Sequence, residues 1–362
     1  MKTTNLIQLA KAKKQALCGH QTGLSLIEVM IALLIGVFLI GGILEIFINS
    51  KQTYRMQEGL SRLQENGRFA LDFLADDIRM AGFIGCNNSA SLTNTTSPVY
   101  TPNTLNTPTA FLYNFSKPIE GFESTSTSAW TPTINVAIGS PQGGSDVITI
   151  RRAADLGFNV ITQVSVTAGL TLDTSATTTN LQSADFLNSS GSNNCSIAVV
   201  NNCTSASIFQ VSSISGGVLS HNTGSTCTPD NSTNSLVTTF VGGQVYPINT
   251  ISYFVSTNTN NNLSIYRRIG SSNAQELVEG IEQMQILYGE DTDQDGSSNY
   301  YVSANNVVNM TNIVSVRISL LAATLDNNLT AQPVPYTYNG TTITPTDNKI
   351  RRVFNTTIAI RN

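Results

Sequence analysis

Apolar and polar positions divide the chain of 362 residues into three regions. Residues 24–48 are apolar at nearly every position, and residues 49–82 carry apolar side chains at the spacing of a helix. Beyond Ser89, short apolar runs rich in β-branched and aromatic residues alternate with polar stretches that lack helical periodicity. The pattern predicts one long N-terminal helix followed by a mainly β domain.

The first apolar region is long enough to cross a membrane. From Leu24 to Ile48 it contains 25 residues, which as a helix extend about 37 Å, against about 30 Å for the hydrocarbon core of a bilayer. Four lysines and no acid precede it, at positions 2, 11, 13 and 14. Because positive flanks stay in the cytoplasm, we expect a single pass with the N-terminus inside and the bulk of the chain outside.

The same helix is predicted to continue as an amphipathic segment. It would run from Leu24 to about Met80. Gly82 or Gly85 is the expected stop. A two-stranded coiled coil is the alternative, but Gly59 and Gly67 interrupt a sustained heptad. The apolar positions of this segment are Leu60, Leu63, Ala70, Leu71, Leu74 and Ile78.

The remainder of the chain is predicted to be strands and loops. Strands are expected at 146–150, 207–211 and 250–255, where β-branched and aromatic residues lie between loop residues. The polar stretches 89–106 and 174–194 are expected to be long loops.

An acidic residue interrupts the apolar region close to its start. Glu28 ends the string Gly-Leu-Ser-Leu-Ile-Glu, and a carboxylate at this position costs about 2.5–3.5 kcal/mol in a membrane unless something pairs with it. An ordinary signal peptide is cleaved after its apolar region, whereas the candidate cleavage point at Gly23 lies before it. Cleavage there would keep the anchor. A plain signal anchor, with Gly23 and Glu28 placed by chance, is the alternative.

The string at 23–28 resembles the type IV prepilin motif. The resemblance implies that a prepilin peptidase cuts between Gly23 and Leu24 and methylates the new N-terminus at Leu24. It also implies that Glu28, as the fifth mature residue, neutralises the terminal amine of a neighbouring subunit during assembly. Leu24 and Ser25 depart mildly from the commoner Phe or Met and the commoner Thr. Glu45 lies near the outer end of the apolar region, and we assign it no role.

Residues 67–86, and the stretches 275–288 and 314–321, resemble PilW-type minor pilins. The resemblance implies an α+β, type IV pilin-like fold, in which the long helix packs on a mainly antiparallel β head with long loops. The implied divisions are a cleaved leader at 1–23, a membrane and filament-core half of the helix at 24–48, an amphipathic half at 49–82 and a head at 83–362.

The family implies a minor pilin of a type IV pilus, or fimbrium, which takes part in twitching motility. Such a protein waits in the inner membrane and is then built into the extracellular pilus tip, where it primes or supports assembly. The implied partners are other minor pilins, the major pilin, the prepilin peptidase and the inner-membrane assembly platform. A pseudopilin of a type II secretion system and a membrane-anchored surface binder or adhesin remain as alternatives.

The charge of the chain makes nucleic acid an unlikely partner. Only 12% of residues are charged, and removing the first 23 residues, which carry +4, changes the net charge from -4 to -8. Three arginine pairs, at 151–152, 267–268 and 351–352, could form a basic cluster. We expect instead that they make surface ion pairs.

Cysteine usage is typical of an oxidising compartment once the leader is removed. Of five cysteines, Cys18 lies in the leader, and an even number remains for two disulfides. The short spacing of Cys195 and Cys203 favours a loop staple, which would leave Cys86 with Cys227. Zinc is disfavoured because no C-x-x-C spacing is present.

A short acidic segment matches the opening of a calcium loop. Aspartates at 291, 293 and 295 alternate before a glycine, and Ser297 and Asn299 could add oxygens. Val302 stands where an EF-hand needs a glutamate, so an EF-hand is excluded. A solvated turn is the alternative to a Ca²⁺ site, and no other cofactor is expected.

No enzymatic activity is expected. The sequence has no P-loop, no H-E-x-x-H and no G-x-S-x-G motif, and His221 is the single histidine that remains after cleavage at Gly23.

Overall fold

The structure is a computed structural model that describes residues 23–86 and 101–361. The predicted leader, apart from Gly23, and the first twelve residues of the loop predicted at 89–106 lie outside these ranges. Contacts divide the chain into two compact units, which meet between Gln57 and Glu58 in sequence. The two units are described separately below.

Helix α1 (Leu26–Arg79) passes through both units. Its bounds agree with the predicted helix to within about two residues. Gly82 follows with a φ of 79°, in the left-handed region that favours glycine, and its N–H donates to the carbonyl of Arg151 at 2.8 Å. The predicted helix stop is therefore confirmed.

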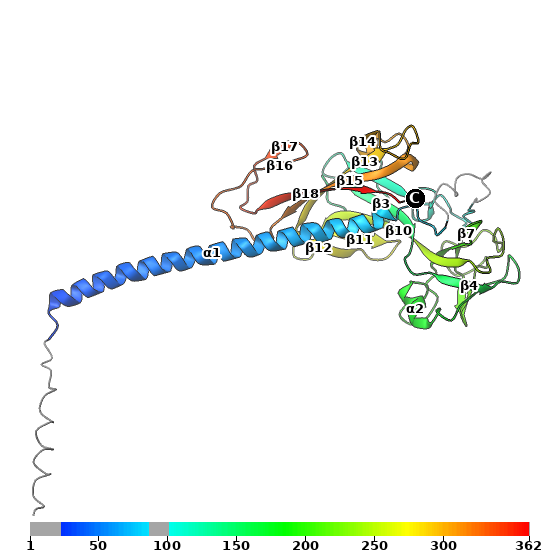
Figure 1. Cartoon of the computed structure of the whole chain (residues 1–362), viewed down its shortest axis with the longest axis horizontal. Coiled ribbons are helices and arrows are strands. Elements are labelled where there is room, and N and C mark those ends of the chain that lie inside the picture. The colour runs from blue at the N-terminus through cyan, green and yellow to red at the C-terminus, as the bar shows by residue number, and fades with distance from the viewer. Residues whose placement is uncertain (1–22, 87–100, 362) are drawn as a thin grey trace, which may run out of the picture. The chain divides into compact units, whose positions relative to one another are not determined.

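Within the described residues, the second unit is built from two antiparallel sheets and a small hairpin (Figure 1). The first sheet contains β1 (Ile119–Ser124), β2 (Trp130–Thr131), β3 (Val147–Ala153), β4 (Phe158–Thr162), β5 (Leu170–Leu172), β6 (Ile197–Asn201), β7 (Ala206–Gln210), β8 (Ser213–Ser215), β9 (Val218–Ser220), β10 (Gln244–Thr257), β11 (Leu263–Ile269) and β12 (Gln275–Glu279). The second sheet has the order β14 (Tyr300–Val302), β13 (Ile281–Glu290), β15 (Ile313–Ala323) and β18 (Arg351–Ala359). The hairpin pairs β16 (Tyr336–Tyr338) with β17 (Thr341–Ile343). The α+β class and the three predicted strands, which correspond to β3, β7 and β10, are confirmed.

Strand β10 joins two parts of the second unit. Its residues 248–253 pair with β3 and its residues 251–257 pair with β11, on the sheet that packs against α1. Its first residues, 244–247, pair with β4 and β6 in a second lobe. Because β10 has 14 residues, it can pair with strands of both parts. This one strand therefore connects the second lobe to the main sheet.

The second half of α1 presents one apolar face to the main core. Leu63, Ala70, Leu74 and Ile78 are buried there against residues of both sheets. Gly67 lies on the same face, and a Cβ at this position would collide with the ring of Phe354 in β18. The amphipathic half predicted from sequence is therefore a packed helix, and not a coiled-coil strand.

The second lobe has its own apolar core, which includes Phe158, Phe186, Phe209 and Phe240. It contains α2 (Thr178–Ser183), a short helix in the stretch that we expected to be a loop. Thr177 caps this helix by accepting the N–H of Asn180. The prediction of a long loop at 174–194 missed this helix, which is stabilised by burial of Leu181 and which periodicity over six residues cannot reveal.

Two disulfides form from the four predicted cysteines, but the expected pairing is wrong. Cys86 bonds Cys203 and Cys195 bonds Cys227. Strand β6 lies between Cys195 and Cys203, and five extended residues advance about 16 Å, too far for one disulfide. The observed bonds tie the segment after α1 to the turn that follows β6, and the segment before β6 to the loop that precedes β10.

Within the described residues, four of the six arginines in these pairs form ion pairs, as predicted, while Arg268 and Arg352 form none, and several of the ion pairs are buried. Asp77 of α1 is 3% exposed, and its carboxylate accepts from Arg152 at 2.8 Å and from the hydroxyl of Tyr253. Arg267 lies 4.0 Å from the same carboxylate. Burial, and then the charge of Asp77, raise the pKa of Tyr253, which stays a neutral donor. The network connects α1 to three strands.

Two other arginines have separate partners. The Arg151 side chain is 1% exposed, and its guanidinium donates to Glu120 at 2.8 Å and to the carbonyls of Lys117 and Phe111. Arg351 pairs with Glu282 and Asp347, both at 2.7 Å. The expectation of surface pairs is therefore corrected, since these cations hold strands and loops together inside the head.

Replacing Asp77 with alanine should strongly destabilise the head. It would leave Arg152 largely buried with the exposed Asp155 as its one acidic partner among the described residues, and breaking a buried pair costs about 3 kcal/mol. The unfolding midpoint of full-length protein in urea measures the loss. Asp76→Ala is the matched control, because that neighbouring side chain is 80% exposed and its pair with Arg79 should be worth less than about 0.5 kcal/mol. Equal losses for the two variants would contradict a special role of Asp77.

Candidate functional site

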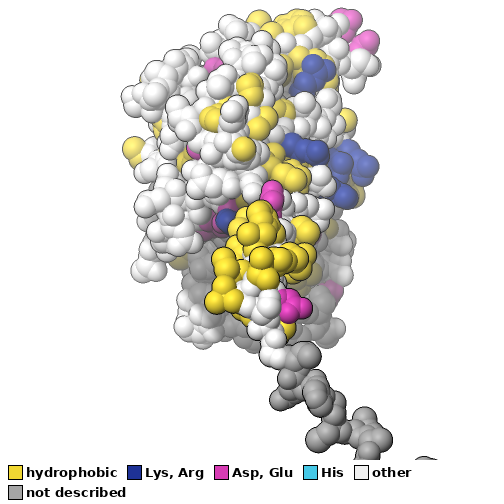
Figure 2. All heavy atoms as spheres, turned by 90° about the vertical axis from the view of Figure 1, so that its left-hand side faces the viewer, with side chains coloured by type: hydrophobic (Ala, Val, Ile, Leu, Met, Phe, Trp, Pro, Cys, Tyr) yellow, Lys and Arg dark blue, Asp and Glu magenta, His cyan; other side chains and the backbone are white. Residues whose placement is uncertain are grey.

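The predicted cleavage and anchor residues lie at the start of α1 in the first unit. Leu24 is 73% exposed, and the apolar side chains from Leu26 to Ile48 are exposed as well. Figure 2 shows hydrophobic side chains gathered on this part of the chain. By length and composition, α1 is a helix that could span a membrane. Such a surface needs lipid or other apolar helices around it.

The local contacts of Glu28 reveal a role that we missed from sequence. Its carboxylate accepts the N–H of Ser25 at 3.4 Å, and its own N–H donates to the hydroxyl of Ser25 at 3.4 Å. This reciprocal arrangement is a capping box, in which both side chains satisfy N–H groups at the first turn of a helix. The signal was present as Ser-x-x-Glu before an apolar run. Both capping hydrogen bonds are long, so the carboxylate of Glu28 keeps oxygen lone pairs for a stronger partner.

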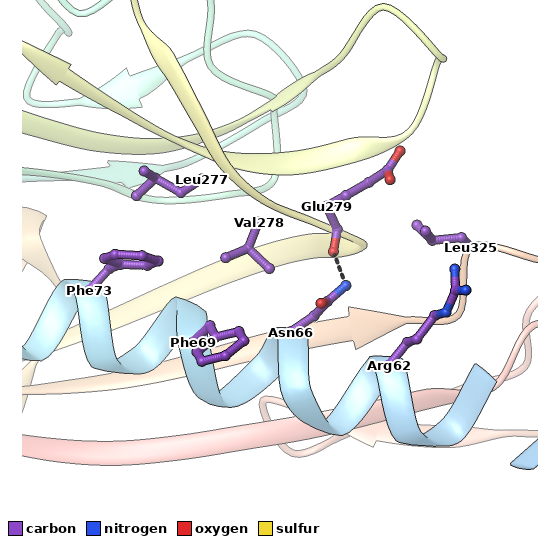
Figure 3. Close-up of a pocket in the computed structure, with 8 residues that line it drawn as sticks. All are labelled: Arg62, Asn66, Phe69, Phe73, Leu277, Val278, Glu279 and Leu325. Carbon is purple, nitrogen blue, oxygen red and sulfur yellow. Dashed lines mark hydrogen bonds between the residues drawn. The ribbon is translucent and has the colours of Figure 1, made fainter. Parts of the chain in front are cut away.

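A groove of about 460 Å³ lies in the second unit between α1 and β12 (Figure 3). Its apolar wall includes Phe69 and Phe73, which are 50% and 43% exposed, and Leu277. Asn66 points from α1 across the groove and donates to the carbonyl of Glu279 at 2.9 Å. This bond satisfies one backbone acceptor at the end of β12 and fixes the helix beside the strand.

The lining of this groove suits packing better than catalysis. Its ionisable residues are Arg62 and Glu279, and its remaining members are apolar or amide side chains. None of the residues that line it is a serine, cysteine or histidine. The groove can therefore bury apolar side chains of another surface, but it holds no nucleophile with a base.

The predicted calcium residues lie in the loop between β13 and β14. One carboxylate oxygen from each of Asp291, Asp293 and Asp295 lies within 4.8 Å of the others. Asp291 also accepts the N–H groups of Gln294 and Gly296, at 2.6 and 2.8 Å. These N–H groups outweigh the effect of desolvation and lower the pKa of Asp291. The loop thus gathers carboxylate oxygens, which are ligands of the type that calcium takes.

The two further residues predicted for this site have other contacts. The side-chain oxygen of Asn299 accepts from the N–H and the hydroxyl of Thr292, at 2.7 and 3.0 Å. The N–H of Ser297 donates to Asp295 at 2.7 Å. Asn299 would have to release Thr292 to offer that oxygen to an ion, whereas the three aspartates are already together.

A pair of carboxyl groups that sequence did not reveal lies under the second sheet. Asp146, 2% exposed, accepts the N–H groups of Ser124 and Ile286 at 2.9 and 2.8 Å. Glu123 is its acidic neighbour, and the buried hydroxyl of Tyr288 has no hydrogen-bond partner among the described residues. Burial, and then the charge of Glu123, raise the pKa of Asp146 to about 7, against the opposing effect of the N–H donors. Burial raises the pKa of Glu123 as well.

This pair should make the head less stable at alkaline pH. Between about pH 4 and pH 7 the Asp146 carboxyl binds more protons in the folded protein than in the unfolded chain, so its contribution to the free energy of unfolding falls as pH rises through this window. The loss should be a few kcal/mol at most. Urea unfolding at pH 5 and pH 8 measures it. Glu123→Gln removes the like charge, lowers the pKa of Asp146 and should reduce the difference.

An unrelated exposed acid supplies the control. Asp72→Asn on α1 should leave the difference between pH 5 and pH 8 unchanged, because that side chain is exposed. Because burial lowers the pKa of His221, that residue contributes a pH dependence of opposite sign, so the decisive comparison is between the wild type and Glu123→Gln. An equal pH dependence of these two proteins would contradict the effect of Glu123 on Asp146.

The remaining candidate, His221, is a structural residue. It is 1% exposed, its Nε2 lies 3.0 Å from the carbonyl of Ala168, and burial lowers its pKa. A neutral imidazole packed beside Phe209 fills the core of the second lobe. Its position gives no support to an acid–base function.

Comparison with known proteins gives one family match. Residues 252–362 match the family model described as Type IV Pilus-assembly protein W. The matched region contains the last six residues of β10 and all of β11 to β18, and so includes the second sheet, the groove strand β12 and the acidic loop. No curated protein and no solved structure matches the chain.

Proposed function

Because residues 252–362 carry this family's domain, the chain is a PilW-type type IV pilus protein, and from that premise we propose that it is a minor pilin, cleaved after Gly23 and built into the pilus tip. The observation that carries the proposal is Glu28, an acid five residues after a candidate cleavage point, at the start of an exposed apolar helix. The family match supports pilus assembly, and the leader sequence supports processing.

The proposed mechanism follows from the cost of an unpaired charge. Cleavage after Gly23 creates an ammonium group at Leu24, four residues before Glu28. In apolar surroundings a carboxylate and an ammonium each need a partner. A subunit that joins the helical bundle would place its Glu28 beside the terminal amine of a neighbour, and both penalties would fall. The peptidase would methylate that amine, which keeps its charge.

The head would then carry the contacts that distinguish this subunit from the repeating one. The groove beside Phe69 and Phe73 offers an apolar surface on the flank of α1. No Lys or Arg occurs from Ala153 to Tyr266, so the second lobe lacks the cations that would neutralise phosphates. These features support protein partners, which we propose are other minor pilins, the major pilin and the inner-membrane assembly platform, over nucleic acid.

Glu28→Ala should greatly reduce incorporation into filaments while leaving cleavage intact. The variant loses the charge that pairs with the neighbouring amine, and an uncompensated ammonium disfavours docking. Immunoblots of sheared filaments and of membranes give the ratio of assembled to waiting protein. Intact mass and N-terminal sequencing of the native protein report whether it begins at a methylated Leu24.

Glu45→Ala is the matched control, because this second acid of the apolar helix has no assigned role. It should assemble like the wild type. A native protein that retains its first 23 residues would overturn the proposal. Protein found in membranes and never in filaments would favour a surface binder, and a deletion that stops protein secretion but not motility would favour a pseudopilin.

We also propose that the acidic loop binds Ca²⁺. The three gathered carboxylates support it, with an affinity expected in the range of extracellular modules, at or below millimolar. Isothermal calorimetry of the full-length protein should detect one ion, and Asp293→Asn should weaken binding. Asp72→Asn removes the same charge at a position on α1, outside the loop. This control should bind calcium as the wild type does. An absence of binding heat at millimolar calcium would leave the loop as a solvated turn.

A further inference from the structure

The second sheet ends in a strand with a free edge. Strand β18 has nine residues and pairs with β15 along one side, and within the described residues no strand pairs with its other side. The pairing with β15 is regular, without a bulge, from Ser315 opposite Ala359 to Ala323 opposite Arg351. β18 is therefore a long, straight edge strand.

The hydrogen bonds show which backbone groups point outward. At one end of the ladder Ile360 donates to Val314, and at the other Thr324 donates to Ile350, both at 2.9 Å. In an antiparallel pair such bonded positions recur every second residue. Even-numbered residues of β18 therefore bond β15. The N–H and C=O groups of the odd-numbered residues face away, and in the described part of the chain those of Val353, Asn355, Thr357 and Ala359 have no partner. The next outward N–H, that of Arg361, donates to the carbonyl of Arg79 at 2.9 Å, so the open part of the edge ends at Ala359.

This edge lacks the devices that usually prevent strand addition. Protected edges are short, bulged, or carry lysine or proline. Residues 353–360 read Val-Phe-Asn-Thr-Thr-Ile-Ala-Ile, with no charge, no proline and three β-branched aliphatic side chains. A sequence of this type pairs readily with another extended segment.

The charges at the two ends of this stretch indicate what kind of segment would pair with it. Arg352 and Arg361 flank the uncharged stretch, both are exposed, and neither makes an ion pair within the described residues. Two copies of β18 paired antiparallel would bring Arg352 of each close to Arg361 of the other, which is unfavourable. Acidic residues at both ends of the incoming segment would instead face these cations.

We propose that the outer edge of β18 binds an extended, uncharged segment of another protein, with an acidic residue at each end, as an added strand of the second sheet. Main-chain bonds to Val353, Asn355, Thr357 and Ala359 would supply affinity, and the two arginines would set the register. The inference goes beyond the proposed function, because it does not require cleavage, Glu28 or a filament.

Hydrogen exchange on the full-length protein in detergent tests it. The probe is a synthetic peptide of alternating threonine and valine with two glutamates at each end, and its control has lysines at the ends. The glutamate peptide should slow exchange at the four outward amides, while inward amides such as Phe354 stay unchanged. It should bind at least about tenfold more tightly than the lysine peptide, since each favourable end contact contributes roughly a factor of three or more.

Two kinds of variant separate the backbone and charge contributions. Thr357→Pro removes one outward N–H without touching the β15 ladder, and should weaken binding about tenfold. Thr342→Pro is the matched control, because Thr342 also directs its N–H outward, from the β16–β17 hairpin. If Thr357→Pro fails to fold, the double charge reversal Arg352→Glu with Arg361→Glu still decides, because it should invert the preference toward the lysine peptide.

Four results would overturn the proposal. In the first, neither peptide slows hydrogen exchange at the outward amides. In the second, both peptides bind equally, so that the arginines do not discriminate between them. In the third, the outward amides already exchange slowly in the free monomer, which would mean that this chain covers its own edge. In the fourth, protection grows with protein concentration and a dimer sediments, which would make a second copy the occupant.

Discussion

A single buried carboxylate, Asp77, holds the long helix on the head. Its oxygens meet Arg152 of β3 and Tyr253 of β10, with Arg267 of β11 nearby, so that one side chain of α1 connects to three adjacent strands. A buried ion pair adds little net stability compared with an apolar contact, but it is demanding in geometry. It therefore fixes the rotation and height of the helix, while the apolar face around Leu74 supplies the burial energy.

Other features of the head depend on this placement of α1. With α1 fixed, Gly67 lets Phe354 of β18 approach the helix closely, and Asn66 reaches the end of β12. The groove and the free edge of β18 are consequences of that placement. The long β10 carries the second lobe away from the helix, where two disulfides stabilise a polar domain that contains no Lys or Arg. In the head, Lys and Arg thus occur in sequence only before Ala153 and after Tyr266, outside that lobe.

Asp77 and Glu28, two acidic residues of α1, differ in how well their charges are satisfied. Asp77 has its partners within its own chain. Among the residues that the structure describes, Glu28 has only the capping contacts of Ser25, on a helix whose apolar surface is exposed. A charge that is satisfied locally stabilises a fold, whereas one left weakly satisfied in an apolar segment favours association with whatever completes it. This difference is the physical basis for the proposed assembly role.

Sequence alone determined the helix, its stop near Gly82, the membrane-length apolar region, the β character of the head and the identity of the disulfide cysteines, because each depends on local periodicity or composition. Tertiary structure decided the rest. The pairing of Cys86 with Cys203 depends on β6 lying between Cys195 and Cys203, and the burial of Arg152 depends on Asp77, which is 75 residues away. The Glu123–Asp146 pair and the open edge of β18 likewise arise only when distant segments meet. Such contacts are long-range, and a pattern in one segment carries no information about which partner will face it.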